Sequence, residues 1–537
     1  MKGGYVMPKN NDFKFGDCFA LPNPGLKSYF DIVRKGQPDE YRTTFAKGSS
    51  LSKVLAEWEP TVTQLADKWP SLLQFENDLR EKVGPLSIMK PLRERLEDID
   101  AYYSGILLPA EPISRSAVEA VIAEFRNTGL FSPRSMWDTA VKMKKSTNSG
   151  SPYFTKRRVV TDKTLPILRL TPGPGFEQVT GKQMSYYHYC AILGWRGQEG
   201  GPSKDDVKQR VVWMFPYAVN IRELQVYQPL IERCQSANLV PAWVSMESVD
   251  SSITKLFDTK GRDDLIVCTD FSKFDQHFNA EMQNAALAVL SGLLTTSKLS
   301  QEWLRDIFPI KYEIPLAYDY AKLRFGKHGM GSGSGGTNAD ETLAHRALQY
   351  EAALNARSRL NPNSQCLGDD GILSYPGITV EDVVRSYTAH GLEMNESKQY
   401  ASKQDCTYLR RWYHQDWRPD GVCRGVYSTY RALGRLCEQE RFYDPEVWSR
   451  EMVALRQLSI IENVKWHPLR NQFAEFCMQR DKYRLGIDIP GFLRDITRIA
   501  KAATDVMPDF LGYTRSQQKN ADQGISDWWI VKYLKSK

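Results

Sequence analysis

Three aspartates stand at the ends of short apolar runs, where folding could bring them together. Asp270 follows the run 265–269, and Asp369 and Asp370 form the centre of the segment 364–375. Clustered carboxylates raise one another's pKa unless cations neutralise them, and hard divalent cations such as Mg²⁺ prefer oxygen ligands. Two such cations about 4 Å apart can clamp the attacking and leaving oxygens of a phosphoryl transfer. The aspartates therefore predict metal-assisted phosphoryl transfer.

Hydrophobic periodicity indicates the elements that must position these acids. The run 265–269 is apolar and rich in β-branched residues, as in a buried strand. The segment 364–375 has the apolar flanks and tight centre of a β-hairpin. Asn279 is a favourable N-cap for a helix with apolar residues at spacings of three and four, and 337–354 predicts a second helix.

A glycine-dense loop, 329–337, precedes this second helix. Its backbone N–H groups would suit anions, so contact with phosphate or sugar is expected. Gly331, Gly333 and Gly336 fit a G-x-G-x-x-G pattern, and the loop resembles a Walker A segment. The residues before the loop are charged rather than a buried strand, and the Walker lysine before Thr337 is absent. A dinucleotide-binding or P-loop protein is therefore not favoured.

Composition places the chain among large globular proteins. It has 537 residues, which is about three to four units of roughly 150 residues, with 42% hydrophobic and 25% charged residues. No stretch approaches the roughly 18 apolar residues of a membrane span, and the start lacks the apolar core of a signal peptide. We expect an intracellular protein without membrane insertion, whose nine scattered cysteines are buried thiols.

Positive charge is unevenly distributed along the chain. The net charge of +7 fits a nucleic-acid partner only if basic residues gather in a groove. No acid occurs between Asp138 and Asp162, whereas six Lys and Arg residues crowd into 142–158. A solvated surface is the ordinary explanation of one charge run, so this segment indicates function only in combination with the acids.

Taken in order, these segments resemble the palm of viral RNA-dependent RNA polymerases, most closely those of picobirnaviruses. Asp270-Phe-Ser-Lys-Phe-Asp275 is similar to motif A, Ser332-Gly-Ser-Gly-Gly-Thr337 to motif B, and Gly368-Asp-Asp370 to motif C. The resemblance extends to motif D at 390–398, motif E at 408–411, motif F at 208–210 and motif G at 149–153. The matched motifs span about half of the chain, and both ends stay unassigned.

The resemblance implies a mixed α/β right-hand fold of fingers, palm and thumb. The palm would be an antiparallel sheet with flanking helices, and the thumb would be mainly helical. The implied division is an N-terminal extension that bridges fingers and thumb (1–80), fingers (81–225), palm with motif A (226–282), a fingers insertion (283–328), palm with motifs B to E (329–415), and thumb with a C-terminal tail (416–537).

The resemblance also implies roles for the acids. Asp270 and Asp369 would bind two Mg²⁺ or Mn²⁺ ions, and Asp370 would support one of them. Lys398 is the expected general acid for the pyrophosphate leaving group, although a surface lysine on the motif D loop is an equally ordinary explanation.

A departure from the family pattern concerns sugar selection. Asp275 would sense the ribose 2′-OH together with polar groups of motif B. The Asn that often follows the motif B Thr by four residues is Glu341 here, whereas Asn338 directly follows Thr337. Which of the two assists Asp275 is open, and Asn338 is favoured because a neutral amide avoids a second unpaired acid.

Further residues are assigned to nucleotide and RNA by the same resemblance. Lys208 and Arg210 would hold the triphosphate, and Ser332, Thr337 and Asn338 would complete the nucleotide site. Tyr153 and Phe154 would be available to stack on bases. The expected RNA-binding residues are Lys144, Lys145, Gly150, Lys156, Arg157, Arg158, Arg410 and Arg411.

The activity implied is template-directed transfer of ribonucleotides to an RNA 3′-OH, in replication and transcription of a viral RNA genome. Partners would be template and product RNA and ribonucleoside triphosphates, with a viral capsid protein as a further candidate. The enzyme would be a monomer in the virion interior and host-cell cytoplasm. The alternatives are a reverse transcriptase-like polymerase, which usually has a bulky residue in place of Asp275, and a non-catalytic RNA-binding virion protein.

Overall fold

The three aspartates lie on a four-stranded antiparallel sheet in the order β11-β6-β10-β9. This computed structural model describes residues 25–167, 177–178, 182–183, 190–320, 322–442, 446–506 and 524–537. The predicted strand and hairpin are confirmed, because β6 ends directly before Asp270 and the β9-β10 turn contains Asp369. The strands of the sheet are β6 (Ile266–Thr269), β9 (Gln365–Leu367), β10 (Asp370–Leu373) and β11 (Tyr400–Ser402).

Both faces of this sheet are covered, as the apolar character of its strands requires. Successive side chains of a strand point to opposite faces. Val267 and Leu373 therefore join the main core, whereas Ile266, Cys268 and Ile372 pack on the other side against α10 and β12. The covering elements are α5 (Arg115–Arg126), α10 (Met246–Thr259), α12 (Ala280–Leu293), α15 (Thr337–Asn355), β12 (Asp405–Tyr408), β13 (Arg411–His414) and β14 (Val426–Tyr427).

The two predicted helices form where the sequence places them. The Asn279 side chain accepts hydrogen bonds from the N–H groups of Glu281 (3.0 Å) and Met282 (3.2 Å), so it caps α12 as predicted. α15 begins at Thr337 and ends one residue beyond the predicted end. It is buried along nearly its whole length because α5, α12 and β9 pack around it.

A second four-stranded sheet carries the basic segment around Arg210, in the order β5-β4-β7-β8. β4 pairs antiparallel with β5 and parallel with β7. Its strands are β4 (Ala191–Gln198), β5 (Lys208–Met214), β7 (Leu316–Asp319) and β8 (Lys322–Arg324). The remaining elements of this part of the chain are α1 (Gly25–Lys35), α4 (Leu96–Ser104), α6 (Met136–Lys142), α7 (Arg157–Thr164), β2 (Glu177–Gln178), β3 (Lys182–Gln183), α8 (Tyr217–Ala237), α9 (Pro241–Val244), α11 (Phe274–His277), α13 (Lys298–Asp306), α14 (Ile310–Glu313) and α16 (Val380–Thr388).

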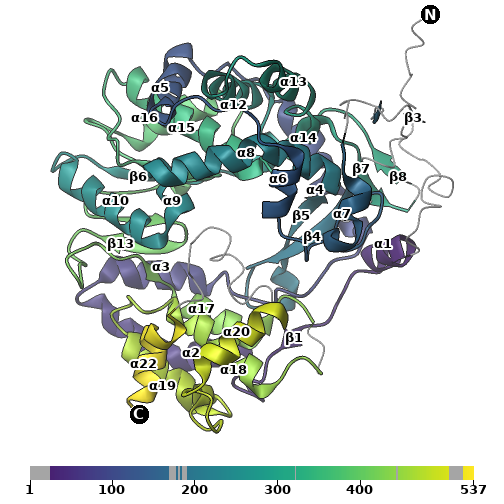
Figure 1. The fold of residues 1–537 in the computed structure, drawn as a ribbon. Coiled ribbons are helices and arrows are strands. Elements are labelled where there is room, and N and C mark those ends of the chain that lie inside the picture. The colour runs from purple at the N-terminus through teal and green to yellow at the C-terminus, as the bar shows by residue number, and fades with distance from the viewer. Residues whose placement is uncertain are drawn as a thin grey trace, which may run out of the picture.

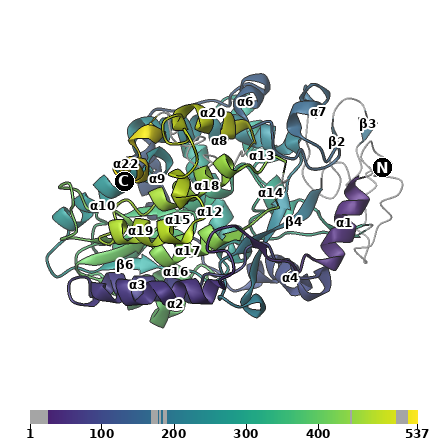
Figure 2. The ribbon, with the colours of Figure 1, turned by 90° about the horizontal axis from the view of Figure 1, so that it is seen from below.

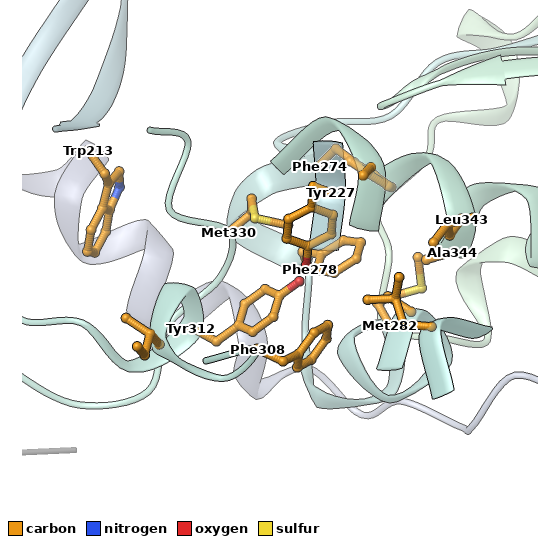
Figure 3. Packing of buried hydrophobic residues seen from close by; sticks show 14 of the residues in the cluster. Trp213, Tyr227, Phe274, Phe278, Met282, Phe308, Tyr312, Met330, Leu343 and Ala344 are labelled. Carbon is orange, nitrogen blue, oxygen red and sulfur yellow. The ribbon is translucent and has the colours of Figure 1, made fainter. Parts of the chain in front are cut away.

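One buried core, rich in aromatic side chains, includes residues of both sheets, and Figure 3 shows part of it. Phe278, close to motif A, stacks on Tyr312 with ring centroids 5.9 Å apart. The hydroxyls of Tyr227 and Tyr312 both donate to the carboxylate of Asp340 on α15, which also pairs with the buried Lys311 at 2.9 Å. Motifs A and B are therefore held by one shared core.

The last part of the chain forms a helical region, shown yellow-green to yellow in Figure 1. The purple helices α2 and α3 from the start of the chain lie beside it in both views (Figures 1 and 2), and they share its core, where Trp58 packs on Phe473. A strand pair, β1 with β15, adds to this contact. The elements are β1 (Tyr41–Arg42), α2 (Leu51–Val62), α3 (Pro70–Arg80), α17 (Thr429–Cys437), β15 (Glu438–Gln439), α18 (Arg450–Glu462), α19 (Arg470–Arg480), α20 (Ile496–Val506) and α22 (Trp529–Lys535).

Among the described helices, none combines the length and apolar character needed to cross a bilayer. The cysteines of the described ranges are all buried, as expected for small core thiols. Cys18 lies outside those ranges.

Candidate active site

Strand pairing brings the remote acids together. Gly371 of β10 lies opposite Thr269 of β6, so the residues beside this pair, Asp270 and Asp370, reach the same edge of the sheet. Asp369 occupies the turn between β9 and β10, next to Gly368, whose φ of +57° favours glycine. Asp270 and Asp369 are exposed to solvent at this edge. The arrangement that the sequence predicts for these acids is therefore present.

The electrostatics of the turn show an excess of negative charge. Burial and then the charge of Asp369 raise the pKa of Asp370 to about 7. Asp369 is open to solvent, but the pKa of the Asp369 carboxyl is also raised. The largest cause is the surrounding protein, the second is the charge of Asp275, and Asp270 adds to the effect. Because like charges at this density oppose ionisation, a bound cation would stabilise the carboxylates.

A divalent metal ion fits the donor chemistry of this edge, which consists of carboxylate oxygens. Oδ2 of Asp370 accepts a hydrogen bond from the Leu409 N–H at 2.8 Å, so that oxygen is turned toward motif E. Within the described ranges, no group of three or more His, Cys, Asp or Glu side chains is arranged as a ready metal cluster. Because Leu409 occupies Oδ2 of Asp370, the candidate ligands are Asp270, Asp369 and the second oxygen of Asp370.

The Gly-Asp-Asp turn is supported from behind by α15. Thr342 accepts a hydrogen bond from the Gly368 N–H at 3.0 Å, and His345 Nδ1 lies 2.8 Å from the Gly368 carbonyl oxygen. Burial lowers the pKa of His345 to about 4, so at neutral pH its ring is uncharged and donates to that carbonyl. A side chain at Gly371 would lie 2.6 Å from the His345 ring, which explains the second glycine of the turn.

Gln399 fixes the backbone of Asp270, a role that sequence reasoning missed. Its side-chain oxygen accepts from the Asp270 N–H at 2.7 Å, and its amide donates to the Asp270 carbonyl oxygen at 2.9 Å. Gln399 directly follows Lys398, which is exposed at the end of a short 3-10 helix. The general-acid role of Lys398 stays a prediction.

Asp275 on α11 is paired with Arg210 on β5. Oδ2 of Asp275 and Nη2 of Arg210 are 3.1 Å apart, so the residue expected to hold phosphate contacts the residue expected to sense the ribose. Glu341 also lies here, and burial followed by the charge of Asp275 raises the pKa of its carboxyl well above its ordinary range. A protonated Glu341 would not add an unpaired charge beside Asp275.

Asn338 is exposed near the same turn. Its side-chain oxygen accepts a hydrogen bond from the Trp243 indole at 2.7 Å, which leaves its amide group for other partners. The choice between Asn338 and Glu341 as the partner of Asp275 stays a prediction, although the electrostatics place Glu341 beside Asp275.

The glycine loop differs from the sequence-based expectation of free N–H groups. The N–H of Gly331 donates to Lys311, that of Ser334 to Gly331, and that of Gly335 to the carboxylate of Glu223. A Cβ at Gly333 would lie 1.6 Å from the Trp213 carbonyl oxygen. These glycines allow close packing on β5 and α8, and many of the loop's amides bind protein rather than an anion.

The two motif B hydroxyls hold this loop in place. Ser332 donates to the Val211 carbonyl oxygen and accepts from the Trp213 N–H, at 3.3 and 3.4 Å. Thr337 donates to the carbonyl oxygens of Gly331 and Ser334, at 3.1 and 3.2 Å. Because each hydroxyl donates its one proton here, their predicted role in nucleotide binding would use the lone pairs that these contacts leave.

The predicted RNA-binding segment is divided between exposed and inward-facing residues. Lys144, Lys156 and Arg158 are exposed, as is Lys208 on β5. Lys145 donates to the Tyr217 hydroxyl at 2.9 Å.

The other members of the segment contact protein. Arg157 lies over the Tyr217 ring, 5.1 Å from its centroid, and donates to the Asn220 side chain at 3.0 Å. Gly150 has a φ of +63° and packs against the Phe215 carbonyl. The Phe154 ring lies 5.0 Å from that of Tyr29, so packing occupies a side chain considered for base stacking.

The motif E arginines face different neighbours. Arg410 lies in the β12-β13 turn, half-exposed, with its guanidinium 3.4 Å from Glu199. Burial raises the pKa of the Asp250 carboxyl, and the charge of Arg411 opposes this increase, which places Arg411 close to Asp250. RNA contact by either arginine stays a prediction.

Comparison with known proteins identifies the family of this chain. Residues 202–429 match the model of the family described as viral RNA-dependent RNA polymerase. The chain is 58% identical over 526 residues to a potential RNA-dependent RNA polymerase of human picobirnavirus (strain Human/Thailand/Hy005102/-), covering 97% of this chain and 98% of the relative. The chain therefore belongs to the viral RNA-dependent RNA polymerases, a family of nucleotidyltransferases.

Solved structures of relatives share the fold. The crystal structure of the RNA-dependent RNA polymerase of a human picobirnavirus matches with a TM-score of 0.91 at 57% identity, over 96% of this chain and 98% of that one. An insertion-loop deletion mutant of such a polymerase matches with a TM-score of 0.89 at 56% identity, over 96% and 97% of the two chains. The expected mixed α/β right-hand polymerase fold is confirmed.

Proposed function

We propose that this chain copies an RNA template by joining ribonucleoside triphosphates, and that it replicates and transcribes a viral RNA genome. The observation that carries the proposal is the meeting of Asp270 with the Asp369-Asp370 turn at one sheet edge, beside the Arg210–Asp275 pair. Family membership supports the same activity.

Asp270, Asp369 and Asp370 are the proposed ligands of two divalent ions, Mg²⁺ or Mn²⁺. Bound there, such ions would supply Lewis-acid stabilisation of the phosphoryl oxygens and orient the 3′-OH. The turn geometry holds Asp369 toward solvent while Leu409 fixes one oxygen of Asp370. The backbone contacts of Gln399 keep Asp270 at the end of β6.

Arg210 and Asp275 are proposed to act on opposite ends of the incoming nucleotide. An arginine fork can bind two phosphate oxygens, so a triphosphate would compete with Asp275 for the Arg210 guanidinium. The carboxylate released in this way would accept a hydrogen bond from the ribose 2′-OH. Ser332, Thr337 and Asn338 are proposed to complete the nucleotide site, and Lys208 to add positive charge for the phosphates. Lys398 is proposed to protonate the leaving pyrophosphate.

The wider assignments are proposals of the same kind. RNA would contact the exposed basic residues of the segment 142–158 and the motif E arginines. The division 1–80, 81–225, 226–282, 283–328, 329–415 and 416–537 follows from the resemblance. The separate cores of the sheet region and the helical region support only the distinction of the thumb from the rest. A monomer in the virion interior and host-cell cytoplasm, with capsid protein as a partner, follows from the resemblance alone.

Substitution of the acids tests the proposal most directly. Asp270→Ala or Asp369→Asn should lower template-directed incorporation by about 10³ or more, if the carboxylates hold the ions that stabilise transition-state charge. The matched control is Asp263→Asn, because Asp263 is an exposed acid shortly before β6 and forms a surface ion pair with Lys403. Retention of about a tenth of the rate in either variant would remove these acids from catalysis.

The two alternatives predict different outcomes. A reverse transcriptase-like enzyme would extend a primer with dNTPs in preference to rNTPs. A non-catalytic RNA-binding virion protein would show no Mg²⁺-dependent incorporation with either, and Asp369→Asn would leave its RNA affinity unchanged. A reverse transcriptase usually has a bulky residue at the position of Asp275. The aspartate here therefore favours the ribonucleotide polymerase.

A further inference from the structure

Glu199 is a nearly buried acid at the tip of the β4-β5 hairpin, and the mechanism above does not use it. It directly follows β4, and its side chain is only 7% exposed. A carboxylate so far removed from water needs charged partners to stay ionised. The partners of Glu199 come from a distant part of the chain.

Three arginines converge on the Glu199 carboxylate. Nε of Arg431 contacts its two oxygens at 2.9 and 3.0 Å, and Nη2 of Arg435 contacts it at 3.0 Å. Arg410, from the β12-β13 turn of motif E, lies 3.4 Å away. Arg431 and Arg435 are four residues apart on α17, so both point from one face of this helix.

The cluster is a strong ionic contact rather than a solvent-exposed pair. Burial alone would raise the pKa of Glu199, but the charges of Arg431, Arg435 and Arg410 outweigh it and hold the pKa below its ordinary value. Arg431 also lies over the Tyr427 ring, 5.1 Å from its centroid. The hairpin tip is thereby fixed to both motif E and α17.

The strands that Glu199 joins carry the nucleotide-site cations. Gln198, its neighbour, pairs with Lys208, and Arg196 pairs with Arg210 across the hairpin. Strand geometry places Arg210 roughly 7 Å along β5 from Lys208. Any displacement of the tip would therefore be transmitted through the β4-β5 ladder to Arg210 and its contact with Asp275.

We propose that Glu199 is a positioning residue for the nucleotide site, which fastens the β4-β5 hairpin to motif E and α17 so that Lys208 and Arg210 are presented to the triphosphate. The inference rests on the proposed function, because it assumes that these two cations bind the incoming nucleotide. Glu199 itself touches neither substrate nor metal.

The test is steady-state and single-turnover kinetics of Glu199→Gln on a primed template. The neutral amide keeps the shape but loses the charge, so KM for the nucleotide should rise about tenfold while kcat falls less than about threefold. Glu199→Asp, which keeps the charge, should recover much of the affinity. Lys204→Gln is the matched control, because Lys204 lies in the same loop and forms an exposed pair with Glu40 at 3.8 Å; its kinetics should match the unmodified chain.

A double-mutant comparison separates positioning from general destabilisation. If the ion pairs act as one unit, Glu199→Gln combined with Arg431→Gln should raise KM hardly more than Glu199→Gln alone. The proposal would be overturned if Glu199→Gln left KM unchanged. It would also be overturned if kcat fell in proportion to a lower melting temperature. If Glu199→Gln does not fold, Arg435→Gln decides, with a rise in KM of about threefold expected and no rise contradicting it. Absence of RNA synthesis by the unmodified chain would instead refute the proposed function.

Discussion

Single residues of the site are governed by the competition between burial and neighbouring charge. Asp369, Asp370 and Glu341 all have a raised pKa because protein surrounds them and other acids are near. Arg210 is the cation that opposes this charge on the nucleotide side. The site therefore favours cationic ligands at the aspartates and anionic ligands at Arg210.

Asp275 provides the residue-scale prediction. Asp275→Ala should reduce the preference for rNTPs over dNTPs by roughly tenfold or more, since a hydrogen bond to a charged group contributes about 1.5–3 kcal/mol. Asp275→Asn, which keeps a hydrogen-bonding group, should lose less. Discrimination is measured as the ratio of kcat/KM values for matched rNTP and dNTP. An unchanged ratio in Asp275→Ala would exclude this residue from sugar recognition.

Sequence reasoning found the acids but not the residues that orient them. Asp270 and Asp369 are recognisable because each ends an apolar run. Gln399, Thr342 and His345 have no such local signal, because their roles depend on contacts between elements far apart in sequence. A polar residue directly after motif D is the only sequence feature that could have indicated Gln399.

At the scale of elements, the predictions succeeded where periodicity was strong. The strand before Asp270, the hairpin, the capped helix after Asn279 and the helix from Thr337 all form as expected. The glycine loop was predicted less well, because composition alone cannot distinguish glycines that expose their N–H groups from glycines that permit close packing. Contacts with β5 and α8 decide in favour of packing.

Gly333 provides the element-scale prediction. A Cβ at this position would meet the Trp213 carbonyl oxygen, so Gly333→Ala must displace the motif B loop from β5. Overpacking of this kind costs about 1–3 kcal/mol, and we expect a lower melting temperature together with at least a tenfold loss of incorporation. The control is Gly194→Ala on the neighbouring strand, where the nearest atoms are 3.5 Å away and belong to the flexible Met214 side chain. Equal behaviour of the two variants would contradict the packing role of Gly333.

At the scale of the whole molecule, a buried histidine makes stability depend on pH. Burial lowers the pKa of His467 to about 3, and its Nδ1 accepts a hydrogen bond from the Leu469 N–H at 3.0 Å. Because the unfolded chain binds this proton with a pKa near 6.5, the contribution is complete above that pH and decreases as the pH falls toward 3. At pH 5 the loss amounts to about 2 kcal/mol.

His467→Asn isolates this effect, since the Asn oxygen can replace Nδ1 as acceptor without titrating. Between pH 7 and pH 5, the melting temperature of the unmodified chain should fall more steeply than that of the variant. Parallel curves would show that His467 does not titrate on unfolding. His345 and other buried groups titrate in both proteins, so the difference between the curves is the informative quantity.

The pairing of β1 with β15 has a consequence for synthesis of the chain. Arg42 and Glu438, which form an ion pair across these strands, are 396 residues apart. During translation the apolar faces of α2 and α3 therefore emerge from the ribosome long before the helices that will cover them. The segment of β1, α2 and α3 must therefore wait for the helices that complete its core, and apolar surface exposed in this way favours aggregation until it is covered.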